Sequence, residues 1–369
     1  MRKIRTAIIG CGKGAHLHAP GLKSLPNSEF VACCSSKMER AKAFADQYGL
    51  KPYTSVTEMR EKSGVEMVCV VTQHPQHAAP TVEAANNGMH VLVEKPLASS
   101  LADCDAMIDA CKKNNVKLGT ICQRRFYAPS QRIRKAIDTG KIGKPVLGSA
   151  IMYGWRSPEY YKADHWRGSW KGEGGGVLVN QAPHQLDLLL WYMGEVAELQ
   201  GYWANLNHPY IEVEDTAVAA VRFKSGALGN IIVSNSQNPA IHCRVAVHGS
   251  NGASVGVQTD GGAMFIAGMS TITEPPVNDL WTVPGEEKML DGWKKEDSEF
   301  FKGIDATSFY HTIQIDDFLK AIVENRQPLI TGEDGRKTVE LFTAIYRSSR
   351  VSHAIKFPLA THGDPGDVA

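Results

Sequence analysis

A carboxylate and a lysine close a short apolar run in the first third of the chain. Glu94 and Lys95 follow residues 90–93, whose aliphatic side chains predict a buried parallel strand. In open α/β sheets, ligands bind outside the carboxyl ends of the strands. A lysine there can donate a hydrogen bond to a reacting oxygen and exchange a proton with it, while Glu94 holds the lysine or shifts its pKa. We therefore predict that Lys95 is catalytic and that both residues contact a cofactor. A surface pair capping a strand is the alternative.

A histidine in the second half is the other candidate for acid–base chemistry. Asn180, His184 and Asp187 recur at helical spacing after a glycine-rich run, which predicts that they share one helix face. A neutral imidazole accepts a proton near pH 7, whereas the amide of Asn180 only orients a hydroxyl. We predict that His184 is catalytic and that Asn180 and Asp187 bind substrate. A structural histidine on an apolar helix is the alternative.

An aromatic segment precedes that helix. Residues 153–170 hold three of the seven tryptophans. Aromatic faces beside hydrogen-bonding groups suit a sugar ring, which has an apolar face and a polar edge. An aromatic contact between subunits is the alternative. The predicted substrate contacts here are Tyr153, Trp155, His165 and Arg167.

A glycine turn near the N-terminus predicts a dinucleotide site. An apolar run at 4–9 leads into Gly10-Cys11-Gly12-Lys13-Gly14-Ala15 and then a helical stretch. In this G-x-G-x-x-A pattern Gly10 permits the tight turn, Gly12 lets the backbone approach a pyrophosphate, and Ala15 allows close helix–strand packing. The strand before it and the helix after it are the expected context. A glycine turn without a ligand is the alternative.

The end of the next strand bears on the choice between NAD and NADP. A carboxylate after residues 29–34 would bind the ribose 2′-hydroxyl and favour NAD, but Ser35 stands there. Ser35, Ser36, Lys37 and Arg40 can bind a 2′-phosphate, so the pattern favours NADP slightly and leaves NAD open. The alternative is that these residues only begin the next helix, 38–48.

The other predicted cofactor contacts belong to the glycine turn or follow later strands. No carboxylate or cysteine near the two histidines among them completes a metal-ligand set, so no metal site is predicted. The residues are Lys13, Gly14, Thr72, Gln73, His74, His77 and Gln123.

Two sheets are expected to position these residues. Strand–helix alternation from residue 1 to about 125 predicts a doubly wound parallel sheet, a Rossmann NAD(P)-binding domain. Residues 126–369 are predicted to form an α/β substrate-binding domain with a large, open, mostly antiparallel sheet, whose last helices pack back toward the first domain. The strands expected there are 146–153, 198–205, 215–223, 227–234, 242–248 and 253–257, with 224–226 as a hairpin turn and helices at 312–324 and 335–349.

Composition sets outer limits on function. A length of 369 residues suits two domains, and a net charge of +1 gives no general attraction to nucleic acid or to an anionic membrane. No apolar run reaches the roughly 18 residues that span a bilayer, and no secretion signal is evident. Eight cysteines without a CxxC pair indicate reduced thiols, so a cytoplasmic location is expected. One flat apolar face of the second sheet predicts a homo-oligomer.

Taken together, the glycine turn, the Glu94-Lys95-Pro96 motif and the helix with His184 and Asp187 resemble the Gfo/Idh/MocA family, named after glucose-fructose oxidoreductase and inositol dehydrogenase. The resemblance covers residues 4 to about 357. It implies a bound nicotinamide cofactor and hydride transfer at a carbohydrate or polyol carbon, with Lys95 and His184 matching the catalytic lysine and histidine. Many members carry aspartate where Asn180 stands, so a Lys–His arrangement replaces a Lys–Asp–His relay.

The resemblance also narrows the activity. The pair Ser35 and Arg40 resembles the corresponding pair in the NADP-using 1,5-anhydrofructose reductases of the family. Residues 180–184 and the aromatic segment resemble those of members that oxidise a ring hydroxyl of glucose or a glucoside at C3. It therefore implies an NAD(P)-dependent dehydrogenase or reductase acting on a ring secondary hydroxyl or ketone. A glycosidase that recycles NAD and a non-catalytic nucleotide-sensing regulator are the alternatives. The sugar, the carbon, the direction, the oligomer size and whether the cofactor leaves after each cycle stay open.

Overall fold

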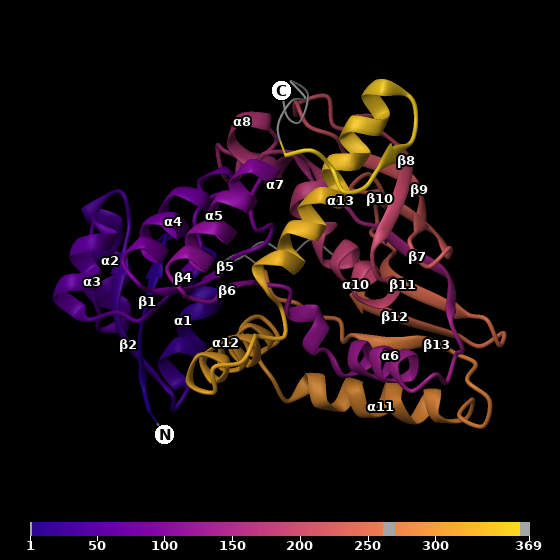
Figure 1. The fold of residues 1–369 in the computed structure, drawn as a ribbon, viewed down its shortest axis with the longest axis horizontal. Helices are drawn as coiled ribbons and strands as arrows, with labels where there is room; N and C mark the ends of the chain where they lie inside the picture. The colour runs from indigo at the N-terminus through magenta and orange to yellow at the C-terminus, as the bar shows by residue number, and fades with distance from the viewer. Residues whose placement is uncertain (1, 261–269, 362–369) are drawn as a thin grey trace. The chain divides into compact units, whose positions relative to one another are not determined.

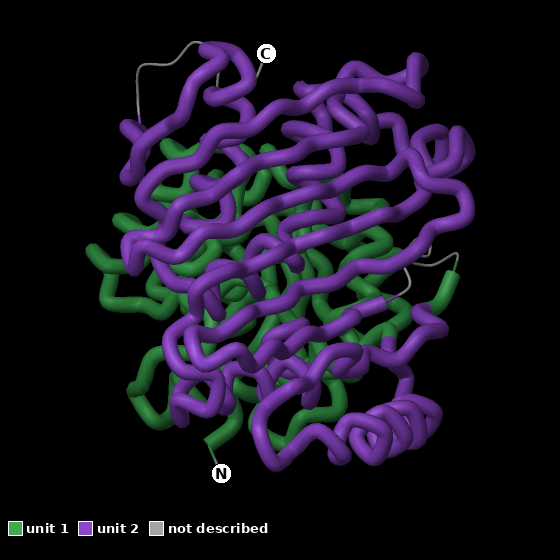
Figure 2. Tube along the Cα trace, turned by 90° about the vertical axis from the view of Figure 1, so that its right-hand side faces the viewer, with its two compact units in different colours: residues 1–123, 267–271, 307–336 green, residues 124–266, 272–306, 337–369 purple. Residues whose placement is uncertain are grey.

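The structure, a computed structural model, describes residues 2–260 and 270–361 (Figure 1). The chain divides into two compact units. The first holds residues 1–123, 267–271 and 307–336, and the second holds residues 124–266, 272–306 and 337–369 (Figure 2). A segment from near the C-terminal end therefore belongs to the same unit as the glycine turn.

The first unit is built on a six-stranded sheet in the order β3-β2-β1-β4-β5-β6, and every neighbouring pair is parallel. The predicted doubly wound parallel sheet is confirmed. β4 and most of β1 and β5 are buried, as expected of strands covered on both faces. The strands are β1 (Ile4–Ile9), β2 (Ser28–Cys34), β3 (Lys51–Tyr53), β4 (Met67–Val70), β5 (His90–Val93) and β6 (Leu118–Thr120).

Six α-helices of the first unit cover this sheet. Ser55 and Ser100 cap α3 and α5 by accepting backbone N–H groups from Glu58 and Asp103, as N-cap serines do. α12 packs against α1 so closely that a Cβ on Gly21 would lie 3.0 Å from the Thr312 Cα (Figure 1). The helices are α1 (Ala15–Ser24), α2 (Met38–Tyr48), α3 (Val56–Ser63), α4 (Ala78–Asn86), α5 (Leu101–Lys113) and α12 (Phe309–Val323).

The second unit is built on an eight-stranded sheet in the order β13-β12-β11-β7-β10-β9-β8-β14 (Figure 2). Only the pair of β7 and β10 is parallel, which confirms a large, mostly antiparallel sheet. The strands are β7 (Pro145–Tyr153), β8 (Val196–Ala204), β9 (Thr216–Phe223), β10 (Leu228–Ser234), β11 (His242–Gly249), β12 (Ser254–Asp260), β13 (Val277–Trp281) and β14 (Ile355–Lys356).

Helices pack on one face of this sheet, where α10 contacts β7 and β11. The opposite face leaves Tyr202, Val218 and Leu228 exposed by 53%, 40% and 54%. In the part of the chain that is described, no helix is long and apolar enough to span a membrane. The helices are α6 (Ala128–Asp138), α7 (Pro158–Lys162), α8 (Trp170–Glu173), α9 (Val177–Asn180), α10 (Pro183–Met193), α11 (Met289–Lys302) and α13 (Gly332–Val351), which begins in the first unit.

Candidate functional site

The parallel sheet of the first unit brings the predicted cofactor residues to one edge. Because all six strands run the same way, their carboxyl ends meet there. The glycine turn follows β1, and Ser35 to Arg40 follow β2. After β4 come Thr72, Gln73, His74 and His77; after β5 come Glu94 and Lys95; and after β6 comes Gln123.

The glycine turn has the space and the backbone geometry that a dinucleotide needs. Gly10 has a φ of 100°, and a Cβ there would lie 2.6 Å from the Val71 carbonyl oxygen, so only glycine fits. A Cβ on Gly12 would meet nothing within 4 Å, so this backbone is open to a ligand. Among the described residues no side-chain hydrogen bond caps α1, and the N–H groups of its first residues donate to the carbonyls of the glycine turn, as Ala15 does to Gly12 at 3.0 Å. The positive end of the helix dipole therefore faces the turn, as an anion there requires.

A second observation at the same edge also fits a bound polar ligand. The side-chain oxygen of Gln123 is buried and has no hydrogen-bond partner among the residues described. A buried acceptor without a partner is costly, and a ligand donor would remove the cost. The edge therefore fits a dinucleotide, with the glycine turn facing its pyrophosphate.

The residues after β2 lie at the same edge of the sheet as the glycine turn. The Ser35 N–H donates to the Tyr53 carbonyl at 3.1 Å, and Ser36, Lys37 and Arg40 are exposed. The N-cap of α2 is Lys37, without a side-chain cap bond. Neither serine is therefore the N-cap, but Lys37 and Arg40 do form the start of α2, so the alternative that these residues only begin the helix stays open for them.

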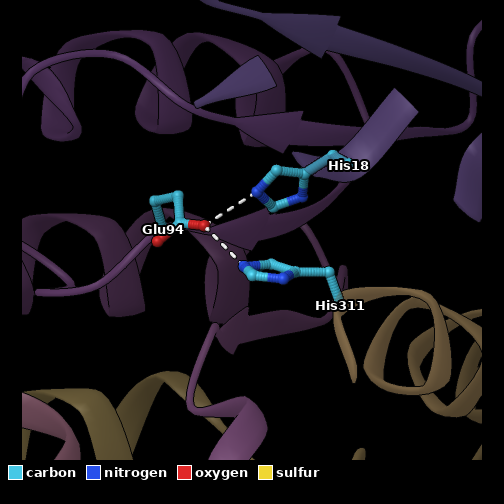
Figure 3. A group of neighbouring side chains, drawn as sticks. All are labelled: His18, Glu94 and His311. Atoms are coloured by element: carbon cyan, nitrogen blue, oxygen red, sulfur yellow. Dashed lines mark hydrogen bonds and ion pairs between the residues drawn. The ribbon is translucent and has the colours of Figure 1, made fainter. Parts of the chain in front are cut away.

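Lys95 is half-buried at the end of β5, and the side chain of Glu94 holds its backbone. The Lys95 N–H donates to Oε2 of Glu94 at 2.9 Å. The other carboxylate oxygen faces Nε2 of His18 at 2.8 Å and Nε2 of His311 at 3.5 Å (Figure 3). Burial alone would raise the pKa of Glu94, but the hydrogen bonds and charge of the two imidazoles outweigh burial and hold that pKa well below its usual range.

His77 is fully buried and bridges two of the loops at this edge. Its Nε2 lies 3.0 Å from the Thr72 carbonyl oxygen, and its Nδ1 lies 2.9 Å from that of Pro96. Burial lowers its pKa, and the facing carbonyls oppose that shift. The sequence predicts that His77 contacts the cofactor, whereas its hydrogen bonds join the loop after β4 to the loop after β5.

The predicted single helix through Asn180, His184 and Asp187 is interrupted, although His184 and Asp187 stay together in α10. α9 ends at Asn180, and α10 starts at Pro183. Pro183 has no N–H to continue the helix, and the Ala182 N–H instead reaches back five residues to the Val177 carbonyl at 2.8 Å. His184 therefore lies half-buried in the first turn of a separate helix.

Asn180 belongs to a polar cluster with the aromatic segment. Its amide nitrogen donates to the Tyr160 hydroxyl at 3.0 Å and to Glu173. Arg167 lies over the Tyr160 ring, also donates to the Tyr160 hydroxyl, and has Glu173 4.0 Å away. The structure thus brings two predicted substrate residues, Asn180 and Arg167, together around Tyr160, which the sequence did not single out.

The other predicted substrate residues make different contacts. Both carboxylate oxygens of Asp187 accept from Arg125, at 2.8 and 2.6 Å, and both side chains are buried. The Trp155 ring contacts His208, the Tyr153 ring contacts His242, and His165 is exposed. These substrate contacts, like the cofactor contacts, stay predictions.

The parallel sheet, the glycine turn and the open strand edge define a Rossmann-type dinucleotide-binding protein. A family model described as an oxidoreductase family with an NAD-binding Rossmann fold matches residues 4–121, and a GFO/IDH/MocA C-terminal domain matches residues 130–255. The chain belongs to the Gfo/Idh/MocA family of oxidoreductases, and its first unit is an NAD-binding Rossmann domain.

Similar proteins cover nearly the whole chain. Myo-inositol 2-dehydrogenase of Thermotoga maritima is 27% identical over 361 residues, 96% of this chain and 98% of the relative. 1,5-Anhydro-D-fructose reductase of Ensifer adhaerens is 28% identical over 354 residues, 95% and 97% of the two chains. The WlbA dehydrogenase of Bordetella pertussis, solved with NADH and UDP-GlcNAcA, has a TM-score of 0.83 and 29% identity, covering 97% of this chain and 99% of that one.

Proposed function

We propose that this protein is an NAD(P)-dependent dehydrogenase or reductase that interconverts a ring secondary hydroxyl and a ketone of a sugar or glycoside. The observation that carries the proposal is the position of Lys95. It follows β5, between β4 and β6 in the sheet of an NAD-binding domain, on the edge that also holds the glycine turn. Relatives named for myo-inositol and 1,5-anhydro-D-fructose, and one solved with UDP-GlcNAcA, support a cyclic polyol or sugar as substrate. The segment 180–184 favours C3 of a glucoside as the reacting carbon.

Lys95 and His184 are the proposed acid–base residues. His184 accepts the proton of the reacting hydroxyl at a ring nitrogen, and Lys95 donates a hydrogen bond to the same oxygen. In the reverse direction the two residues return a proton to that oxygen. Asn180, held by Tyr160 and Glu173, orients a neighbouring hydroxyl.

A bound nicotinamide dinucleotide supplies the hydride acceptor or donor. The backbone of the glycine turn at Gly12 and Gly14 would hold its pyrophosphate, with the positive end of the α1 dipole behind it. Ser35 and Arg40 select between NAD and NADP, with a preference for NADP because no carboxylate stands after β2.

The test of the reaction uses purified protein, NAD⁺ or NADP⁺, and glucose, methyl glucoside and myo-inositol as probes. Cofactor reduction is followed by absorbance. Lys95→Ala and His184→Ala should each lower turnover by about two orders of magnitude, because each removes one acid–base group, and should still bind cofactor. Lys112→Ala and His353→Ala are matched controls, since both side chains are exposed.

Three outcomes separate the proposal from its alternatives. Near-normal turnover in either catalytic variant rules out that residue's role. Release of free aglycone without net NADH identifies the glycosidase instead. Cofactor binding without turnover of any probe favours the regulator.

We also propose that the chain forms a homo-oligomer through the face of the eight-stranded sheet that lies opposite α10. Tyr202, Val218 and Leu228 leave exposed apolar area on three neighbouring strands of that face. Light scattering of the wild type against Val218→Lys tests this, and equal masses at the monomer value would refute it.

A further inference from the structure

Histidines from three separate elements hold the backbone on both sides of Lys95. His18 comes from α1, His77 from the turn before α4, and His311 from α12. All three are buried. Their contacts to the loop that carries Lys95 include the two residues beside it, Glu94 and Pro96.

The first contact runs through Glu94. Its Oε1 lies 2.8 Å from Nε2 of His18 and 3.5 Å from Nε2 of His311 (Figure 3). Its Oε2 accepts a hydrogen bond from the Lys95 N–H at 2.9 Å. One carboxylate therefore connects two helices to the backbone of the proposed catalytic lysine. A carboxylate with donors on both oxygens has one favoured orientation, and the Lys95 N–H is fixed by it.

The second contact runs through the Pro96 carbonyl, one residue after Lys95. Nδ1 of His77 lies 2.9 Å from that oxygen, and Nε2 lies 3.0 Å from the Thr72 carbonyl. A neutral ring donates to one of the two carbonyls and a protonated ring to both. In each state the ring links the loop after β5 to the loop after β4.

His18, Glu94 and His311 also have ligand atoms close enough to hold a metal ion. Two observations favour hydrogen bonding instead. The 2.8 Å between His18 and Glu94 is shorter than the roughly 3.3 Å that separates ligands around tetrahedral zinc with bonds of about 2.0–2.1 Å. In metal sites the second ring nitrogen almost always donates to an outer partner, but Nδ1 of His18 and of His311 has none among the described residues.

We propose that His18, His77 and His311 are positioning residues that hold the backbone of Lys95 through Glu94 and Pro96. The inference builds on the proposed catalytic role of Lys95.

The test measures amide hydrogen exchange at Lys95, which needs no substrate. In His311→Leu one donor to Glu94 is lost, and we expect the Lys95 amide to exchange about tenfold faster or more. His311→Gln restores a donor near the position of Nε2 and should exchange within about threefold of wild type. His77→Leu should also speed exchange. His16→Leu is the matched control on α1, because its side chain is exposed.

Turnover provides the second readout, using the probe sugar with the fastest wild-type rate. His311→Leu should lower kcat about tenfold with the KM for cofactor within about twofold, and the glutamine variant should recover kcat. Unchanged Lys95 exchange in both folded leucine variants overturns the proposal. Stoichiometric Zn²⁺ binding that His311→Leu abolishes overturns it in favour of a metal site. Normal turnover of Lys95→Ala refutes the proposed reaction but leaves the exchange result to decide the positioning role.

Discussion

The Asp187 carboxylate has one role in the sequence prediction and another in the structure, and a single substitution can tell the two roles apart. The sequence predicts a substrate contact, whereas the structure shows two hydrogen bonds from Arg125 at 2.8 and 2.6 Å. The side chains of Arg125 and Asp187 are 5% and 1% exposed. Replacing Asp187 with asparagine would leave a buried guanidinium beside a neutral amide.

The expected cost follows from that burial. Removing one partner of a buried ion pair costs about 3–5 kcal/mol, because the other charge remains desolvated and uncompensated. Asparagine keeps one acceptor, and the Trp191 ring, 5.4 Å from the guanidinium carbon, remains. We therefore expect about 3 kcal/mol, which would lower the melting temperature of the second unit by roughly 6–12 °C.

The assay is thermal and urea unfolding of Asp187→Asn beside Asp138→Asn. Asp138 pairs with Arg134 one helical turn away and is 61% exposed, so its loss should cost about 0.5 kcal/mol or less. Equal stability of the two variants would refute the ion-pair reasoning. If the two variants were equally stable and Asp187→Asn raised the KM for the probe sugar, the results would favour the predicted substrate contact instead.

Three further predictions concern pH, the glycine turn and cofactor choice. Burial raises the pKa of Glu214 to about 7, above that of a carboxyl in the unfolded chain, so the native state holds a proton that the unfolded chain releases. The free energy of unfolding should therefore fall by up to about 3 kcal/mol as pH rises from about 4.5 to about 7. Unfolding of the wild type and of Glu214→Gln at both ends of that pH range checks this, and parallel pH profiles of the two proteins would contradict it. Gly10→Ala should lower the melting temperature, because the added Cβ would clash with the Val71 carbonyl. Gly12→Ala should keep the fold but bind NADH more weakly, as measured by fluorescence titration. An equal loss of stability in both variants would count against the assigned geometry of the turn. Ser35→Asp should shift the ratio of kcat/KM toward NAD by about tenfold or more, because its carboxylate repels a 2′-phosphate; an unchanged ratio would place cofactor selection elsewhere.

Local sequence signals were sufficient where an element had a strong pattern of its own. The aliphatic run that predicted residues 90–93 is β5, and the predicted helix 38–48 is α2. The edge strand β3 was missed because it has three residues, one of them a proline. β13 and β14 were also missed, and β14 has two residues.

The site could be predicted in part, for a similar reason. The rule that ligands lie beyond the strand ends brought the cofactor residues together without any knowledge of packing. It could not find His18 or His311, since a lone histidine in a helix carries no signal of the carboxylate it will meet. The spacing of Asn180, His184 and Asp187 misled because Pro183 interrupts the helix between them.

The contribution of α12 to the site depends on how distant segments pack, so sequence patterns could not predict it. Its contact with α1 at Gly21 and Thr312 places His311, one residue earlier, beside Glu94. One turn further on, Gln314 donates to the Thr120 carbonyl at 2.7 Å and accepts the Cys122 N–H at 3.0 Å, fixing the end of β6. The same helix therefore sets the ends of both β5 and β6. The two strand ends that carry Lys95 and Gln123 are aligned by a segment about 200 residues later, which no local pattern in residues 1–125 could reveal.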